Sequence, residues 1–156
     1  MGDIISVFKK EMLVILFAMT PVFELRGAIP LGITLGFEPI HSTILSIAGN
    51  IIPVPLLLKL LKPTFRYFEK TKVFGGIIDW IKRRTLRRSE KVRKYKVFGL
   101  YLLVAIPLPT TGAWTGCIAA SLFEIDFKQA FPAIVAGVIT AGIIMLILSY
   151  MGMQIV

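Results

Sequence analysis

Four long apolar blocks constrain this chain more than any other feature of its sequence. They cover residues 4–18, 40–61, 97–123 and 127–156. The second and fourth approach or exceed the roughly 20 residues that an α-helix needs to cross the hydrocarbon core of a bilayer. Apolar residues make up 56% of the chain, against roughly 45–50% in soluble domains. The sequence therefore predicts an all-α integral membrane protein, with one membrane domain over residues 1–156.

Basic residues are concentrated in the middle of the chain. Of the 18 Lys and Arg residues, 14 lie between Lys59 and Lys96. Because short loops rich in Lys and Arg stay on the cytoplasmic side, we expect residues 62–96 to be cytoplasmic and to contact anionic lipids of the inner leaflet. No nucleic-acid-binding motif accompanies this charge, so nucleic acid is not an expected partner.

The basic middle also carries a helical pattern of apolar side chains. Phe74, Ile77, Ile78 and Ile81 recur at i, i+3, i+4 and i+7, and a run of basic residues follows them. This spacing predicts an amphipathic helix that lies on the inner leaflet. The linker, residues 63–96, would thus separate a first repeat, residues 1–62, from a second, residues 97–156.

Motifs for metal, cofactor or catalysis are missing from the sequence. One cysteine, Cys117, and one histidine, His41, exclude an internal disulfide and offer no Cys/His cluster for a structural metal. The sequence has no GxxxxGK[ST], no HExxH and no nucleophile elbow. We therefore expect no cofactor, no ATP-driven pump and no enzyme.

Proline, glycine and polar residues interrupt the apolar sequence at two places. The first interruption reads PVFELRGAIPLG over residues 21–32, and the second reads PLPTTGAWTG over residues 107–116. A pair of interrupted hydrophobic segments in matching halves is the best sequence pointer to a transporter's binding site at the bilayer midplane. The residues expected to shape the backbone of these segments are Pro21, Gly27, Pro30, Pro107, Pro109, Gly112 and Gly116.

The two halves of the chain also resemble each other weakly. An offset of 86 residues aligns Pro21 with Pro107 and Phe37 with Phe123, and an insertion of two residues then brings Gly49 opposite Gly137. Each half has an apolar approach, a broken segment, an acidic boundary and a long apolar helix. Internal symmetry of this kind is typical of transporters built from repeats.

Two topologies fit this pattern. If each broken segment enters the membrane and returns to the same side, each half is a re-entrant hairpin followed by one transmembrane helix. The repeats are then inverted and both termini lie outside. If each broken segment crosses fully, the repeats are parallel and both termini lie inside. We favour the re-entrant version, and either one implies a cavity, because irregular backbone at membrane depth must be buried in protein or line a wet space.

The first interruption carries two ionisable residues, Glu24 and Arg26. An ionisable residue at membrane depth is a functional hypothesis by default. Glu24 would be a protonatable group, and Arg26 would hold an anionic substrate, because a guanidinium matches phosphate or carboxylate bidentately. The alternative is that these charges pair with each other or with polar groups and only fix the hairpin tip.

The second interruption offers hydroxyls, backbone groups and an indole. Thr110, Thr111 and Trp114 are its polar candidates for substrate contact. Pro107 and Pro109 forbid a continuous helix there and free nearby carbonyls. The alternative is that one of the threonines caps a half-helix, whose N-terminus would also favour an anion.

The GxxxG pairs and Asn50 have predominantly structural interpretations. The GxxxG pairs Gly32/Gly36 and Gly112/Gly116 allow close helix packing, either within the chain or in a homodimer. Asn50, inside the first long apolar helix, is expected to make an interhelical hydrogen bond rather than to contact substrate.

The run FELRGAIPLGI followed by AIPLPTTGAWTG resembles the putative small multidrug export protein family over nearly the whole chain. More distantly, the chain is similar to the DedA family, the VTT or SNARE-associated Golgi protein superfamily. That resemblance implies a prokaryotic inner membrane, paired re-entrant hairpins, and proton-linked transport or flipping of lipid carriers such as undecaprenyl phosphate. The superfamily's acid in the first hairpin maps to Glu24. Its arginine in the second hairpin has no counterpart between Pro107 and Gly116.

These observations predict a multi-pass cell-membrane transporter or flippase of small multidrug export type. It would be a secondary transporter, coupled to protons or another ion, for a small or amphipathic substrate that Arg26 would hold if the substrate is anionic. Membrane lipids, the substrate and a second copy in a homodimer are the expected partners. The alternative is a non-transporting membrane scaffold protein whose broken helices serve packing.

Overall fold

The structure is a computed structural model that describes residues 2–69, 90–108 and 111–153. These residues form seven α-helices, and no β-strand occurs among them. The prediction of an all-helical chain is confirmed. The predicted amphipathic segment at residues 74–88 lies outside the described residues.

The chain begins with a helical hairpin. Helix α1 covers Gly2–Met19 and α2 covers Glu24–Thr34, so the first interruption is a short turn at residues 20–23. Helix α2 continues through Pro30, which is exposed. We expected the break to extend to Gly32. It does not, because a proline removes one helical hydrogen bond and its ring here faces away from the packed side of α2.

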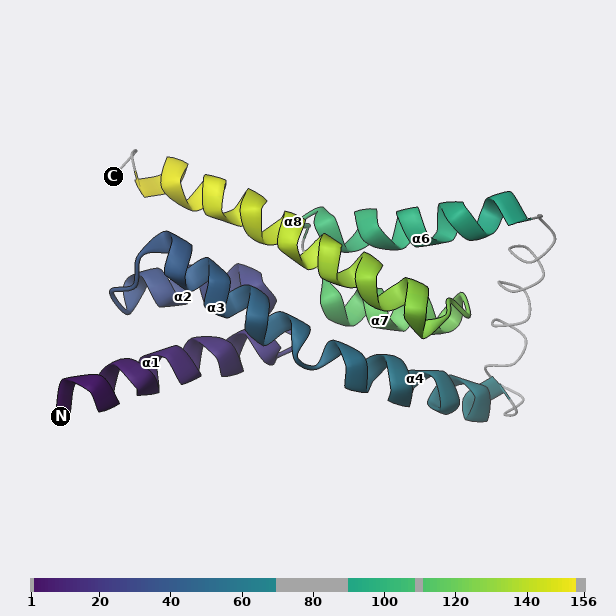
Figure 1. Ribbon diagram of the computed structural model, residues 1–156, viewed down its shortest axis with the longest axis horizontal. Coiled ribbons are helices and arrows are strands. Elements are labelled where there is room, and N and C mark those ends of the chain that lie inside the picture. Colours follow the sequence, from purple (N-terminus) through teal and green to yellow (C-terminus); the bar gives the residue numbers. More distant parts are fainter. Residues whose placement is uncertain (1, 70–89, 109–110, 154–156) are drawn as a thin grey trace.

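A long apolar helix follows the first hairpin. Helix α3 covers Pro39–Ile51 and α4 covers Val54–Glu69, and the two run almost end to end (Figure 1). Pro53 interrupts them because it cannot donate a hydrogen bond to the carbonyl four residues earlier. The apolar stretch Pro39–Thr64 is 26 residues long, about 39 Å at 1.5 Å per residue. That length suffices to cross a bilayer core of about 30 Å.

The second half of the chain has the same order of elements. Helix α6 covers Glu90–Ala105 and α7 covers Ala113–Leu122. Helix α8, Phe127–Met153, contains the second stretch that is long and apolar enough to cross a membrane, Phe127–Gly152. Each half therefore contributes a hairpin and one membrane-capable helix.

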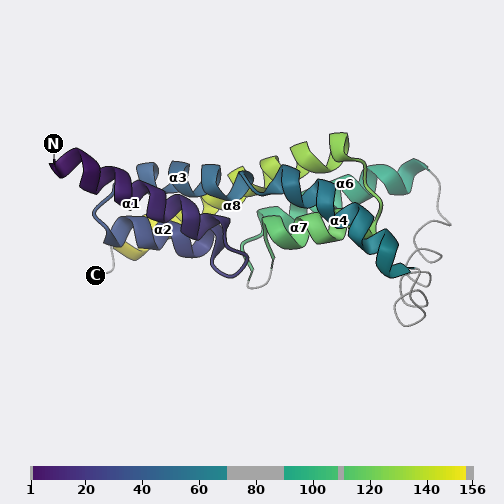
Figure 2. The ribbon, with the colours of Figure 1, turned by 90° about the horizontal axis from the view of Figure 1, so that it is seen from below.

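The two hairpins approach each other from opposite ends of an elongated molecule. The α1–α2 hairpin occupies the left end of Figure 1 and the α6–α7 hairpin the right end, with their connecting turns side by side in the middle. Figure 2 shows the same proximity from below. The first turn of α1 and the last turn of α8 lie at one end, whereas the last turn of α4 and the first turn of α6 lie at the other.

Helices α2 and α7 end with the same backbone motif. The N–H of Phe37 donates to the carbonyl of Gly32, and the N–H of Ile125 donates to the carbonyl of Ala120. In each motif the preceding residue is left-handed, Gly36 with φ +94° and Glu124 with φ +53°. This is the Schellman arrangement, which satisfies the last carbonyls of a helix and reverses the chain. In each half, this motif connects the hairpin to the long helix that follows.

Small residues bring the long helices close to the hairpins. A Cβ on Gly49 would lie 2.6 Å from the carbonyl oxygen of Ile15 in α1, and one on Gly137 would lie 2.7 Å from Cβ of Val104 in α6. Gly32 and Gly116 are equally tight, against Ser42 and Val104. The predicted internal packing of the small residues is therefore confirmed for Gly32 and Gly116. Gly36 instead forms the turn.

Asn50 lacks the hydrogen-bond partner expected for it. Its residue is 1% exposed, and neither its amide nitrogen nor its carbonyl oxygen has a hydrogen-bond partner among the described residues. The predicted interhelical hydrogen bond is thus wrong in this conformation. The buried hydroxyl residues earlier in α3, Ser42, Thr43 and Ser46, bond to backbone carbonyls instead.

The close approach of α3 to α1 gives a test of this fold. Gly49→Ala should destabilise the protein by about 1–3 kcal/mol, the cost of overpacking a tight contact. Gly99→Ala is the matched control, because a Cβ on Gly99 meets nothing within 4 Å. The control should be neutral or slightly stabilising, since alanine favours a helix over glycine. Thermal unfolding in detergent measures both, and equal melting temperatures would contradict the packing described.

Candidate functional site

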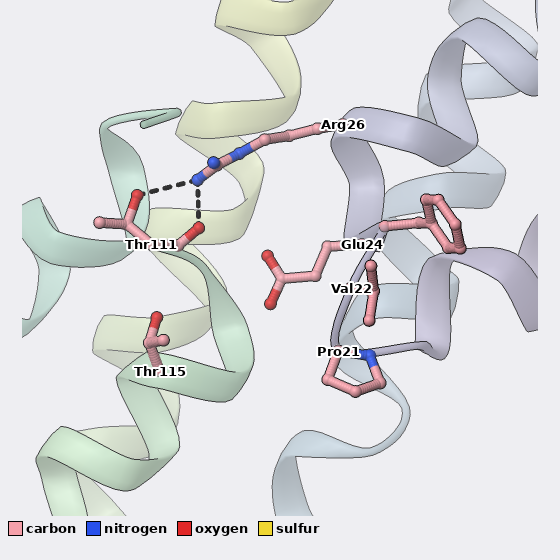
Figure 3. A pocket seen from close by; sticks show the side chains of 7 residues that line it. Pro21, Val22, Glu24, Arg26, Thr111 and Thr115 are labelled. Atoms are coloured by element: carbon pink, nitrogen blue, oxygen red, sulfur yellow. Dashed lines mark hydrogen bonds between the residues drawn. The ribbon is translucent and has the colours of Figure 1, made fainter. Parts of the chain in front are cut away.

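A cavity of about 410 Å³ lies where the two hairpin turns meet. Glu24 and Arg26 come to it from the start of α2, and Thr111 and Thr115 come from the opposite hairpin (Figure 3). Its full lining is Pro21, Val22, Phe23, Glu24, Arg26, Thr111 and Thr115. The structure thus brings together polar residues of the two interruptions that are 85 or more positions apart in sequence.

Glu24 is the most buried charged residue of this site. Its residue is 6% exposed, and its Oε1 accepts a hydrogen bond of 3.2 Å from the backbone N–H of Trp114. Trp114 is the second residue of α7, the position whose N–H an N-cap side chain ordinarily satisfies. The carboxylate therefore caps α7 from the other hairpin. The positive end of the helix dipole also stabilises its charge.

Gly112 makes this contact sterically feasible. It is the N-cap residue of α7 and has no side chain of its own to bond the first turn. A Cβ at this position would lie 1.6 Å from Oε2 of Glu24. Only glycine therefore leaves room for the carboxylate at the N-terminus of α7.

The backbone of Glu24 is strained. Its φ of +49° is in the left-handed region, which costs a residue other than glycine about 1–2 kcal/mol. Such strain persists where the surrounding structure holds it in place, and it clusters at binding and switch sites. Here the turn at residues 20–23 and the contact with α7 hold the Glu24 side chain toward the second hairpin.

Arg26 also reaches across to the second hairpin. Its Nη2 donates to the backbone carbonyl of Thr111 and, at 2.8 Å, to the Thr111 hydroxyl oxygen (Figure 3). No ion pair joins Arg26 to Glu24 among the described residues. Of the alternatives raised for these two charges, mutual pairing is not what the structure contains; each bonds to the opposite hairpin.

Thr111 and Thr115 each bond to the backbone at a different helix end of the second hairpin. The Thr111 hydroxyl accepts from the N–H of Leu108 and lies 2.8 Å from the carbonyl of Ile106, so it secures the end of α6. The first turn of α7 is capped by Thr115, whose hydroxyl accepts from the N–H of Gly112 at 2.8 Å. Of the two threonines predicted as alternative caps of α7, Thr111 therefore does not cap it, and Thr110 lies outside the described residues. Thr115 was missed, because the usual capping-box pattern has Ser or Thr at the N-cap and Glu or Gln at the third helical position, whereas α7 has Gly112 and Thr115 there.

Trp114 contributes in two ways. Its backbone N–H bonds to Glu24, and its indole N–H donates to the carbonyl of Met19, the last residue of α1, at 3.1 Å. The indole does not line the cavity, so it joins the hairpin turns rather than facing the cavity.

The remaining sequence candidates serve the backbone or lie outside the described residues. Gly27 contacts Phe17 and Phe23, whose rings stack at 4.1 Å. Pro107 lies in the turn after α6. Pro109 and Thr110 lie outside the described residues. No group of three or more His, Cys, Asp or Glu side chains within the described ranges could hold a metal ion.

The site thus contains two ionisable groups. One is a buried carboxyl group that can exchange a proton, and the other is a guanidinium that can hold an anion. Both face a cavity large enough for a small molecule.

Comparison with known proteins gives a match to a protein family. Residues 24–144 match the family model described as "Putative small multi-drug export protein". No curated protein and no solved structure matches the chain. The match begins at Glu24 and includes every residue of the cavity except those of the turn before α2. The family and the two membrane-capable helices together indicate a membrane protein of transporter type, and the chain belongs to the small multi-drug export protein family.

Proposed function

We propose that this protein is a secondary transporter or flippase, coupled to protons or another ion, that moves a small or amphipathic substrate across the cell membrane. The observation that carries the proposal is the meeting of Glu24 and Arg26 with the second hairpin around one cavity. An export family is consistent with it. Ionisable residues at membrane depth mark substrate and proton pathways.

We propose that the two halves of the chain form an inverted repeat in the membrane. Thr34 and Leu122, which end α2 and α7, are separated by the same number of residues as Pro39 and Phe127, which begin the long helices. Gly49 and Gly137, which the sequence aligns, each pack against the first helix of their own hairpin. These correspondences favour two copies of one unit. The tip-to-tip approach of the hairpins favours entry from opposite faces (Figure 1).

Protonation of Glu24 is the proposed coupling step. The ionised carboxylate interacts favourably with the N-terminus of α7, and a neutral carboxyl group loses most of that attraction. The two hairpin tips are then held less tightly. A proton therefore shifts the balance between two arrangements of the tips, as a ligand with different affinity for two states must do.

Arg26 is the proposed anion contact. In the present conformation its guanidinium bonds to Thr111, and an anionic substrate in the cavity would compete for the same N–H groups. A phosphate or carboxylate can accept two of them in parallel. The second hairpin has no arginine between Pro107 and Gly116. The guanidinium of Arg26 reaches across from the first hairpin and so supplies a cation there.

A membrane scaffold is the second candidate. The hydrogen bond from the Trp114 indole to Met19 favours it, because this contact joins the hairpins without involving the cavity. The strained backbone of Glu24 and the open cavity beside it favour transport.

Removing the charge of Glu24 tests the coupling. Glu24→Gln keeps the size of the side chain and its acceptor oxygen but can no longer exchange a proton. We expect proton-coupled flux to fall about tenfold or more, because the amide carries no exchangeable proton and its bond to Trp114 lacks the charge that brings such bonds to about 1.5–3 kcal/mol. The assay uses proteoliposomes loaded with the pH dye pyranine, with an anionic amphipathic dye, a cationic one and a fluorescent phospholipid as trial substrates.

Glu38→Gln is the matched control, because Glu38 is exposed at the N-cap of α3 and makes no side-chain capping bond. It should transport like the unmodified protein. Equal flux in Glu24→Gln would remove Glu24 from the coupling step but leave transport standing. No flux of any trial substrate from the unmodified protein would favour the scaffold.

Two substitutions of Arg26 separate charge from geometry. Arg26→Lys retains the positive charge but loses the planar pair of donors, so it should weaken binding of an anionic substrate about tenfold, a loss of ~1.4 kcal/mol. Arg26→Ala should weaken it further. The concentration dependence of flux measures both. If both variants transport anions and cations as the unmodified protein does, Arg26 is a structural link only.

Surface labelling tests the proposed orientation. Cysteines placed at Ile4 and Met151, both exposed and near the two ends of the chain, should react with an impermeant maleimide from outside the cell. A cysteine at Thr64, which is exposed near the end of α4, should react only after permeabilisation. The native Cys117 is fully buried and gives a low background. Termini that react only from the cytoplasm would contradict the inverted arrangement.

A further inference from the structure

A second cavity lies between α6 and α7, away from the site at the hairpin turns. Its volume is about 410 Å³, and most of its lining is apolar, from Leu100, Leu103, Ala119 and Phe123. Gly99 also lines it, and Tyr95 and Lys96 lie at the N-terminal side of this stretch of α6. The cavity is therefore an apolar groove with a cationic group at one end. We name it the α6–α7 groove.

The two polar residues of the groove are of the types found at the membrane–water interface. Tyrosine and lysine gather there because each has an apolar body and a polar tip. Tyr95 is 73% exposed. The ammonium group of Lys96 has three donors, and one makes a long contact of 3.4 Å with the carbonyl of Phe123. Donors thus remain for an anion at the mouth of the groove.

Charge at this end of the molecule favours an anion. The chain is most basic between Lys59 and Lys96, the segment that joins the α4 and α6 ends. Lys59 and Lys62 of α4 reach the turn that connects α7 to α8: Lys59 Nζ lies 5.9 Å from the ring centroid of Phe127, and Lys62 Nζ lies 3.8 Å from Asp126. Because Lys62 is paired with Asp126, the attraction for an acidic headgroup rests on Lys96 and on the net positive charge of this segment. A zwitterionic headgroup has no net charge to be attracted.

Gly99 keeps the groove open. It lines the cavity, and a Cβ added to it would meet no atom within 4 Å. Gly116 on the neighbouring helix is different, because a Cβ there would lie 2.6 Å from Val104. Helix packing therefore requires glycine at position 116 but not at position 99, where the missing side chain leaves room for a ligand.

We propose that the α6–α7 groove binds one anionic phospholipid of the inner leaflet, with an acyl chain along Gly99 and Leu103 and the phosphate at Lys96. The groove combines the two features that such a lipid requires, an apolar channel and a cation at its interfacial end. This binding site is separate from the proposed transport cavity, and it does not depend on whether the protein transports anything.

Native mass spectrometry of the intact protein, released from detergent micelles, tests the assignment. The probes are phosphatidylglycerol and phosphatidylcholine with identical acyl chains. The unmodified protein should retain phosphatidylglycerol preferentially. Lys96→Gln should weaken that binding about fivefold, which corresponds to the ~1 kcal/mol that one basic residue contributes near an anionic surface. Gly99→Leu should weaken it by filling the groove, with no fall in melting temperature.

Lys10→Gln is the matched control. Lys10 Nζ donates to the carbonyl of Leu35 at 3.1 Å, the same type of contact as that of Lys96, but it lies at the opposite end of the molecule and outside this groove. Its loss should leave lipid binding unchanged. Equal losses in Lys10→Gln and Lys96→Gln would assign the effect to net charge and overturn the proposal. So would equal retention of the two lipids, or unchanged phosphatidylglycerol binding in Gly99→Leu. A dimer that Gly99→Leu abolishes, with no lipid preference, would identify a second copy as the occupant.

Discussion

The hydrogen bond between the Glu24 carboxylate and the N-terminus of α7 is the contact on which the centre of this molecule depends. It joins two hairpins that come from opposite ends of the chain's long axis, and it solves two electrostatic problems together. A buried carboxylate needs donors, and the first turn of a helix needs acceptors. Glu24 and Trp114 satisfy each other, and Gly112 leaves the space in which they do so. Arg26 and Thr111 form a second hydrogen bond between the two hairpins.

The same contact makes the centre of the molecule suitable for a switch. The long helices are closely packed, with Gly49 and Gly137 against the first helix of each hairpin. The hairpin tips, by contrast, meet through a few polar groups beside a cavity. Polar contacts that depend on the charge of one carboxyl group can be weakened without disturbing the packed helices. In the proposed transport cycle, protonation of Glu24 weakens these polar contacts and the hairpin tips move apart. In the proposed scaffold, the contacts stay intact.

Much of the fold could be predicted from local patterns. Apolar length located both membrane-capable helices, and the prolines at 21 and 107 located both hairpin turns, because a helix cannot easily continue through a proline that lacks its N–H. Pro30 shows the limit of that rule, since it is tolerated inside α2. The unpartnered amide of Asn50 shows another: a single polar residue in an apolar helix indicates burial, but not which groups surround it.

The sequence by itself determined that the chain is helical and membrane-capable, that helices end near Pro21 and Pro107, and that the first interruption carries the charges. These follow from hydropathy and backbone chemistry, which depend on each residue and its near neighbours. Only the tertiary structure decided what the charges touch. Glu24 and Arg26 are two positions apart, yet they bond to the second hairpin rather than to each other. That outcome depends on how two distant turns meet in space. No local pattern contains it, because the acceptor for α7, Glu24, comes from the first hairpin, whereas the glycine that admits it, Gly112, belongs to the second.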